Sequence, residues 1–280
     1  MHSIIIQGNG LARPLVERTA QVSGAQQSEW RGPHLARLSG FHAAPPRQAV
    51  RDLCEQAGVD CAFLDTPLRL ADFRLAVMDM DSTLITIECI DEIADMQGLK
   101  PQVAAITEAA MRGEIDFRQS LARRVALLKG LEVGALQRVY DERLRLSPGA
   151  EALIAGFKSA GVRTLLVSGG FTFFTDRLKA RLGLDYTASN VLGVEQGRLT
   201  GAVVGPVIDA EAKAEKLRQT CASLEVDPSR AIAVGDGAND LKMMAAAGVS
   251  VAYRAKPVVR EQARFSISHN GLDALLNLFD

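Results

Sequence analysis

The sequence has few cysteines, and their arrangement predicts no covalent or metal-bound framework. Four cysteines occur in the chain, and no two of them form a CxxC pair or show a spacing typical of a zinc site. This pattern argues against a disulfide-stabilised secreted domain and against a zinc-binding module. We predict reduced thiols in a cytoplasmic protein.

Long apolar runs and an excess of one charge are also missing. The longest apolar stretches, such as residues 162–167, fall far short of the roughly 20 residues that cross a bilayer. The N-terminal apolar run has no basic segment before it and stops at Gln7, which argues against a signal peptide. The formal net charge is −1 and no dense lysine or arginine cluster occurs. Neither a nucleic acid nor a membrane is therefore an expected partner.

The chain has the composition of a globular protein, and its first seventy residues form one pattern. Segments in the order β-α-β-β-α-β predict a small α+β sandwich over residues 1–70. The two middle strands have the weakest pattern. The predicted strands are 3–6, a short piece around Trp30, 35–41 and 59–64, and the predicted helices are 11–22 and 45–57.

From about residue 71 the pattern changes to short apolar strands that alternate with amphipathic helices. Strands without polar alternation suit a parallel sheet buried on both faces, so residues 71–280 predict a doubly wound, Rossmann-like α/β domain. The predicted strands are 75–78, 163–167, 231–234 and 249–253, the helices are 150–160, 172–182, 211–223 and 239–247, and a hairpin is expected at 191–204.

A purely helical block interrupts this alternation directly after its first strand. Residues 84–146 show helical spacing throughout, and Asp116 with Gln119 forms a plausible capping box for a helix at 117–128. Helical insertions at such a position close over substrates and exclude water. We therefore expect a cap at about 84–146.

Two carboxylates follow the first strand of the α/β domain. The strand at 75–78 is followed by Asp79-Met80-Asp81-Ser82-Thr83. Open α/β sheets bind ligands at the carboxyl ends of their strands, and two carboxylates can divide the roles of nucleophile and proton carrier. The alternative is a pair of turn-forming aspartates that cap the next helix. These five residues alone do not decide between the two.

Two features after the next strands could hold an anion. Ser168-Gly169-Gly170 supplies a hydroxyl and open backbone N–H groups, although such turns are common without any ligand. Lys213 lies near a predicted helix start, where a lysine is most often a solvated charge. Its place in the order of strands and helices favours a role beside the carboxylates.

A fourth feature follows the predicted strand at 231–234. The run Gly235-Asp236-Gly237-Ala238-Asn239-Asp240 places carboxylates among small residues, which suits Mg²⁺ because this cation prefers oxygen ligands. The start of the run is similar to a dinucleotide fingerprint, but its sixth position is Asp240 instead of glycine or alanine. We therefore reject a dinucleotide site.

The order of these motifs resembles the haloacid-dehalogenase (HAD) superfamily and, within it, the family of phosphoserine phosphatases. The resemblance spans roughly residues 74–267 and extends into the cap, through Glu88-Cys89-Ile90-Asp91-Glu92-Ile93-Ala94 and through residues 117–125. It implies an α/β HAD core over 71–280 with an inserted helical cap. The unit at 1–70 resembles an ACT-like domain.

The resemblance also implies chemical roles. Asp79 is the nucleophile that becomes an aspartyl phosphate, and Asp81 is the acid and then the base. The cofactor is Mg²⁺, and its implied ligands are Asp79, the Asp81 backbone carbonyl and Asp236, with Asp240 in support. The implied phosphoryl-binding residues are Ser168, Gly169 and Lys213, with Asn239 close by.

The cap residues imply the substrate. Glu88 is expected to pair with the amino group of phosphoserine and Arg124 with its carboxylate, while Met111 and Phe117 close over it. The implied reaction is hydrolysis of O-phosphoserine, the last step of serine biosynthesis. Alternatives are another small phosphate, transfer to an alcohol such as homoserine, and a non-enzymatic phospho-aspartate receiver. Asp81 and the cap argue against the receiver. The N-terminal unit is expected to pair subunits in a homodimer or to act as a scaffold, and serine binding there is an open alternative.

Overall fold

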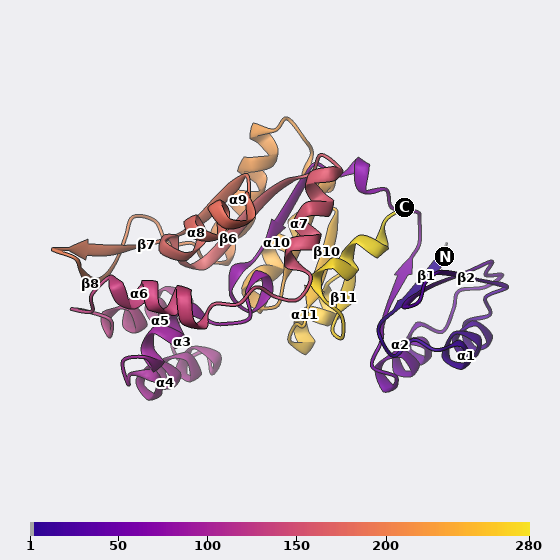
Figure 1. The fold of residues 1–280 in the computed structure, drawn as a ribbon, viewed down its shortest axis with the longest axis horizontal. Coiled ribbons are helices and arrows are strands. Elements are labelled where there is room, and N and C mark those ends of the chain that lie inside the picture. The colour runs from indigo at the N-terminus through magenta and orange to yellow at the C-terminus, as the bar shows by residue number, and fades with distance from the viewer. Residues whose placement is uncertain (1–2) are drawn as a thin grey trace.

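The computed structural model describes residues 3–280, which form two β-sheets with helices around them. Figure 1 shows a four-stranded sheet with two helices at one end of the molecule and a larger sheet in the middle. A group of short helices lies beyond the larger sheet, on the side away from the N-terminal unit. Within residues 3–280, no helix combines the length and the apolar character needed to cross a membrane.

The N-terminal unit is antiparallel and has the predicted order of elements. Its sheet order is β2-β3-β1-β4, so β1 lies between two partners and all its side chains are buried. Strand β2 lies at the edge and its side chains are mostly exposed, which explains its weak sequence pattern. The elements are β1 (Ser3–Gln7), α1 (Arg13–Ser23), β2 (Gln27–Gly32), β3 (Leu35–Ser39), α2 (Arg47–Gln56) and β4 (Asp60–Leu64).

The larger sheet is the doubly wound sheet that the sequence predicts. Its order is β11-β10-β9-β5-β6-β7-β8, and all neighbours pair in parallel except β7 and β8. The chain moves outward from β5 through β6 and β7, and later returns to the other side of β5 through β9. The strands are β5 (Leu75–Met78), β6 (Arg163–Phe171), β7 (Tyr186–Glu195), β8 (Arg198–Val204), β9 (Ala231–Gly235), β10 (Val249–Tyr253) and β11 (Phe265–Ile267).

Helices cover both faces of this sheet. In β5, Ala76 and Met78 belong to the core cluster that contains α7 and α8 side chains, and Leu75 and Val77 belong to the cluster with α9 and α10. Burial on both faces explains why β5 has no polar alternation. The helices are α7 (Ala150–Ser159), α8 (Thr172–Leu182), α9 (Ala210–Ser223), α10 (Leu241–Ala246) and α11 (Pro257–Gln262).

The helical block between β5 and β6 stands off the sheet as a separate layer. It contains α3 (Cys89–Asp95), α4 (Lys100–Met111), α5 (Phe117–Ala126) and α6 (Gly134–Arg138). The predicted capping box is present, because Asp116 Oδ1 accepts the Gln119 N–H at 2.8 Å and Gln119 Oε1 accepts the Asp116 N–H at 3.1 Å. An isolated antiparallel bridge joins Ile85 to Leu146 where the chain leaves and re-enters the core. We propose Ile85 and Leu146 as the limits of the cap.

The structure extends one predicted element, shortens another and adds two that were not predicted. The predicted hairpin at 191–204 is present, since β7 and β8 pair from Val191–Val204 to Glu195–Arg198, but β7 begins earlier, at Tyr186, and its first part pairs with β6. The predicted helix at 239–247 is a 3-10 turn followed by the shorter α10. Helix α11 and the three-residue strand β11 were not predicted, since elements this short give little periodic signal.

A buried carboxylate joins the N-terminal unit to the α/β core. Asp60, the first residue of β4, is 5% exposed and accepts backbone N–H groups from Ser268 at 2.7 Å and Asn270 at 3.1 Å. The Asn270 Nδ2 group donates to the same carboxylate at 2.6 Å. The Asp60 carboxylate therefore accepts the hydrogen bonds of backbone N–H groups in the 268–270 loop of the core.

The C-terminus makes a second connection between the two units. The Asp280 carboxylate pairs with Arg31 at 3.1 Å and with Arg37 at 2.5 Å, and its N–H donates to Leu68 O at 2.7 Å. The chain passes between the units through a 3-10 turn at Leu70–Asp72. We propose a domain boundary at about residue 70 for this reason.

We expect Asp60→Ala to lower the free energy of unfolding by about 2–3 kcal/mol, because it leaves several buried N–H groups of the 268–270 loop without an acceptor. Asp65→Ala is the matched control, since its carboxylate is 59% exposed and pairs only with Arg47. It should cost less than about 1 kcal/mol. Denaturant unfolding of both variants measures the difference, and equal losses would contradict the role of Asp60.

Candidate active site

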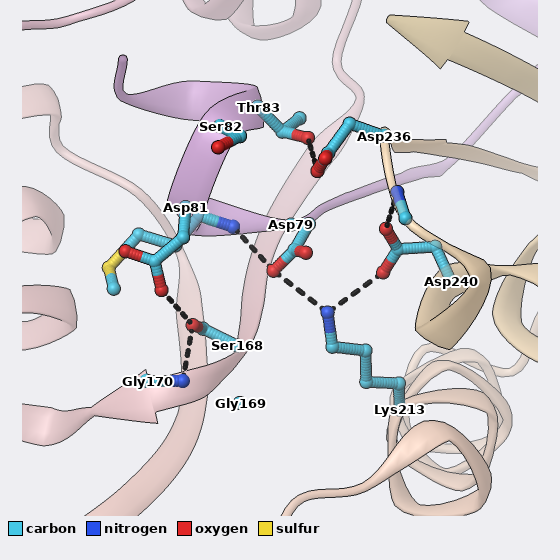
Figure 2. A network of polar contacts seen from close by, with 12 residues as sticks. Asp79, Asp81, Ser82, Thr83, Ser168, Gly169, Gly170, Lys213, Asp236 and Asp240 are labelled. Carbon is cyan, nitrogen blue, oxygen red and sulfur yellow. Dashed lines mark hydrogen bonds and ion pairs between the residues drawn. The ribbon is translucent and has the colours of Figure 1, made fainter. Parts of the chain in front are cut away.

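Three parallel strands bring the predicted motifs to one edge of the sheet. Asp79 directly follows β5, Asp236 directly follows β9, and β6 carries Ser168 near its end. Since β6 and β9 flank β5, these side chains converge where the direction of winding changes, as Figure 2 shows. Such switch points are where open α/β sheets bind ligands.

A tight turn after β5 presents the two aspartates differently. The Leu84 N–H donates to Asp79 O at 3.3 Å and the Ile85 N–H to Met80 O at 3.0 Å, which closes a single helical turn. Inside it, Ser82 has a φ of 56°, a left-handed conformation that is uncommon for a residue with a side chain. The Asp81 carboxylate points toward Ser168 and the Asp79 carboxylate toward Lys213 (Figure 2).

A buried ammonium lies between two carboxylates. Lys213 is 1% exposed, and its Nζ lies 2.8 Å from Asp79 Oδ1 and 2.8 Å from Asp240 Oδ1. The Met80 N–H also donates to Asp79 Oδ1, at 2.7 Å. Burial and the Asp240 charge raise the pKa of Asp79, and the Lys213 charge opposes this rise. The two aspartates raise the pKa of Lys213, so the ammonium stays charged.

Asp81 has different surroundings. Its Oδ1 accepts the Cys89 N–H at 3.0 Å, and its Oδ2 lies 3.4 Å from the Ser168 hydroxyl (Figure 2). Ser168 Oγ in turn accepts the Gly170 N–H at 2.8 Å. Burial raises the pKa of Asp81, while the Cys89 N–H lowers it. A carboxyl with a raised pKa is suited to donate a proton and later to accept one.

The carboxylates beside Asp79 fit a metal ion. Within residues 3–280, one group of three acidic, histidine or cysteine side chains lies within 4.8 Å of one another, and it consists of Asp79, Asp236 and Asp240. Three carboxylates and the Lys213 ammonium leave a net charge of −2, which a divalent cation neutralises. The donor atoms are all oxygens, as hard cations require.

The members of this cluster are held in place to different degrees. Thr83 Oγ1 donates to Asp236 Oδ1 at 3.0 Å, which is the one hydrogen bond of that carboxylate within residues 3–280 (Figure 2). Both oxygens of Asp240 are engaged, one by Lys213 and the other by the Gly237 N–H at 3.1 Å. The Asp236 carboxylate therefore has more capacity left to bind a metal ion than the Asp240 carboxylate, whose contact with Lys213 holds that ammonium in place.

A cavity of about 470 Å³ extends from these carboxylates into the cap. Phe117 closes one side of it, and a Cβ on Gly169 would lie 3.1 Å from the Phe117 ring, so this glycine allows the close approach. Arg118 on the same cap helix pairs with Asp209 of the core at 2.7 Å. The cap therefore lies over the sheet edge in a closed arrangement.

Charged groups line the cap side of the cavity. Glu88 faces the cavity and accepts the Ser82 hydroxyl at 2.7 Å, and burial by the surrounding protein raises its pKa to about 7. Arg124 also lines the cavity, and its buried Nε has no hydrogen-bond partner within residues 3–280. Burial lowers the pKa of Arg124, and the Asp91 and Glu88 charges oppose this. The unpartnered guanidinium N–H indicates a missing anionic ligand.

The structure brings all the predicted site residues together. The ones that line the cavity are Asp79, Asp81, Glu88, Met111, Phe117, Arg124, Gly169, Asp236 and Asn239. Behind them lie Ser168 and Lys213, which contact Asp81 and Asp79, and Asp240, which contacts Lys213.

Sequence reasoning gave no role to four further residues of the site. Thr83 holds Asp236 and Ser82 holds Glu88, while Asp91 and Lys256 line the cavity. The first three lie inside motifs that the sequence made visible. Lys256 follows a strand end, and this position was the only signal for it.

Comparisons with known proteins agree with this arrangement. Residues 73–248 match the family model of haloacid dehalogenase-like hydrolases. A phosphoserine phosphatase of Polaromonas sp. (strain JS666) is 59% identical over 216 residues, which cover 75% of this chain and 92% of that protein.

Two solved structures are also similar. A probable phosphoserine phosphatase from Vibrio cholerae has a TM-score of 0.85 and 37% identity, and the match covers 99% of this chain and 85% of that one. A phospho-aspartyl intermediate analogue of phosphoserine phosphatase has a TM-score of 0.70 and 39% identity, and covers 74% of this chain and 99% of its own.

We expect divalent cations to bind this cluster in a pH-dependent way. Burial and the Asp240 charge raise the pKa of Asp236 to about 6, so below pH 6 a proton competes with the metal and the affinity should fall. Asp236→Asn should weaken binding by at least about 100-fold. Asp91→Asn is the control, since it removes a carboxylate from the same cavity outside the cluster. Calorimetric titration of chelator-treated protein measures both, and unchanged affinity in Asp236→Asn would refute the site.

Proposed function

Because the chain belongs to the haloacid dehalogenase-like hydrolase family, we propose that it is a phosphoserine phosphatase. It hydrolyses O-phosphoserine to serine and phosphate through an aspartyl phosphate, the last step of serine biosynthesis. The observation that carries this proposal is the placing of Glu88 and the unpartnered Arg124 in the cavity that ends at Asp79. An acid and a guanidinium in one cavity suit the ammonium and carboxylate of an amino acid.

We propose Mg²⁺ as the cofactor, held by Asp79, Asp236 and the Asp81 backbone carbonyl, with Asp240 in support. The all-oxygen donor set and the net charge of the cluster support this choice. When bound, the cation neutralises the carboxylates and the phosphoryl oxygens, which otherwise repel one another.

The nucleophile in this proposal is Asp79. The described hydrogen bonds to this carboxylate go to Oδ1, from Lys213 and the Met80 N–H, and these fix its orientation. An Asp79 oxygen attacks phosphorus, the bond from phosphorus to the serine oxygen breaks, and the phosphoryl group is left on Asp79. The solved phospho-aspartyl analogue of a relative supports this intermediate.

Asp81 is the proton donor in the first step and the proton acceptor in the second. With its raised pKa it donates a proton to the departing serine oxygen, which is a poor leaving group as an alkoxide. The resulting carboxylate then takes a proton from the water that attacks the aspartyl phosphate, which releases phosphate and restores Asp79. The Cys89 N–H and the Ser168 hydroxyl hold Asp81 in place for both steps.

The phosphoryl group is held by residues that surround Asp79. Lys213, which contacts Asp79, offsets the charge that develops on the equatorial oxygens. Ser168, the backbone N–H of Gly169 and the Asn239 amide are the further groups that we assign to phosphate binding. Ser168 and Gly169 belong to β6, and Asn239 lies in the 3-10 turn that follows β9.

The cap selects the substrate and excludes water. Glu88 binds the substrate ammonium and Arg124 its carboxylate, while Met111 and Phe117 cover the cavity. Met111 lines the cavity and is 72% exposed, so it lies at the rim of the cavity. Closure of the cap also favours hydrolysis by a single positioned water.

We also propose that the protein acts in the cytoplasm and pairs through its N-terminal domain. All four cysteines are free thiols, which suits a reducing compartment. Strand β2 is an edge strand with exposed side chains, the kind of edge at which a second copy adds a strand.

Phosphate release from O-phosphoserine tests the function. Wild-type protein with Mg²⁺ should release phosphate, a chelator should stop the release, and Asp79→Asn should lower kcat by at least about 10⁴-fold because it removes the nucleophile. Asp95→Asn, in an exposed ion pair of the cap, is the control and should keep full activity. Full activity in Asp79→Asn would exclude the mechanism.

The same assay separates hydrolysis from transfer. Adding homoserine should leave the amount of released phosphate unchanged if water is the acceptor. A fall in phosphate with matching formation of phosphohomoserine would identify a phosphotransferase instead.

We expect Arg124→Ala to raise KM for phosphoserine by about 100-fold, because it removes a charged hydrogen bond to the carboxylate. KM for an aryl phosphate, which has no carboxylate, should change little. Arg123→Ala is the matched control, since Arg123 is the exposed neighbour on the same helix. Equal effects of Arg124→Ala on both substrates would remove its role in recognition.

A further inference from the structure

Strand β6 departs from regular pairing at the turn that carries Ser168. Strands β6 and β7 pair in register as far as Val167, and the pairing resumes only where Phe171 lies opposite Asn190. Residues 168–170 of β6 therefore lie opposite a single residue of β7 and form a bulge. Backbone groups in a bulge lose their partners in the sheet and need others.

The Asn190 side chain supplies a partner for this bulge. Its Nδ2 donates to Gly169 O at 2.7 Å, and its Oδ1 accepts the Ile208 N–H at 2.8 Å. Asn190 is 0% exposed, so both bonds are shielded from solvent. One neighbour can only accept and the other can only donate, so the amide has a single orientation.

A chain of hydrogen bonds leads from this amide to Asp81. The Gly169 carbonyl and the Gly170 N–H belong to one planar peptide group, so a bond that holds the carbonyl also orients the N–H. That N–H donates to Ser168 Oγ at 2.8 Å. Since the Ser168 oxygen accepts this bond, its own hydrogen is left for Asp81 Oδ2, which lies 3.4 Å away (Figure 2).

The bulge also lies directly against the Asp81 carboxylate. A Cβ on Gly170 would lie 2.8 Å from Asp81 Oδ2, so this glycine leaves the room that the carboxylate occupies. A rotation of the Gly169–Gly170 peptide would therefore displace both the Ser168 hydroxyl and the carboxylate beside it. Asn190 is the side chain that bonds to this peptide from the side of β7.

We propose that Asn190 is a positioning residue for the reaction, which acts through the Gly169–Gly170 peptide and Ser168 to hold Asp81 for proton transfer. This role rests on the proposed function, in which Asp81 is the acid. Asp81 gives its proton to the departing oxygen as the bond from phosphorus breaks, so its position matters most when that oxygen is a poor leaving group. A loss of stability alone would affect all leaving groups alike.

The experiment compares kcat/KM for two aryl phosphates, neither of which has the ammonium or carboxylate that the cap binds. Asn190→Asp keeps the shape of the side chain and the acceptor for the Ile208 N–H, but it removes the donor to Gly169 O. We expect kcat/KM to fall about 30-fold for phenyl phosphate and less than about 5-fold for p-nitrophenyl phosphate, because nitrophenolate departs readily without an acid.

Two further variants calibrate this comparison. Asp81→Asn removes the acid itself and should show the same dependence on the leaving group with a larger loss. Thr164→Val is the matched control, since Thr164 is 0% exposed at the opposite end of β6 and its hydroxyl donates to Asp185 Oδ2 at 2.9 Å. It should lower stability and leave the ratio of the two kcat/KM values unchanged.

Equal losses for both aryl phosphates in Asn190→Asp, or no loss, would overturn the role of Asn190 while Asp81→Asn still depends on the leaving group. If Asp81→Asn shows no such dependence, the acid role of Asp81 in the proposed function fails, and the role of Asn190 with it. Asn190→Ser removes the same amide donor without adding a buried charge. It should show the same pattern, and it replaces Asn190→Asp if that variant does not fold.

Discussion

The site depends on one buried ion cluster, in which the Lys213 ammonium lies between Asp79 and Asp240. Two carboxylates this close, in a buried site, repel each other strongly unless a cation lies between them. Lys213 provides that cation at the start of α9, and Asp209 caps the same helix. The position of one helix therefore sets the charge and the orientation of the Asp79 carboxylate.

The two ends of the cavity are built by different means. The sheet end consists of strand termini whose backbone is fixed by parallel pairing, so Asp79, Ser168 and Asp236 have little freedom. The cap end consists of short helices that touch the core through Phe117 and the Arg118–Asp209 pair. A rigid floor and a separate cover suit a reaction in which the phosphoryl group must be positioned and the substrate must enter and leave.

The N-terminal domain is attached to the core through specific polar contacts. Asp60 holds the 268–270 loop, and Asp280 returns to Arg31 and Arg37. The loop held by Asp60 directly follows β11, at the far edge of the sheet from β8. The domain therefore contacts the core at a distance from the chemistry, and a cavity of about 410 Å³ lies along this contact.

The sequence by itself determined the elements with strong local signals. Strands buried on both faces are continuous apolar runs, and the cap helix at Phe117 begins at a capping box that depends only on neighbouring residues. The motifs of the site were visible for the same reason, since each follows a predicted strand. The edge strand β2 gave a weak signal because its side chains are mostly exposed, and α11 and β11 gave weak signals because they are too short to show a period.

Only the tertiary structure decided which groups meet across the chain. Lys213 looks like a solvated lysine in the sequence, and it is buried because α9 packs beside the end of β5. The hydrogen bonds from Thr83 to Asp236 and from Ser168 to Asp81 likewise join separate elements. Charge, burial and hydrogen bonding depend on neighbours in space, and the order of residues along the chain does not contain them directly.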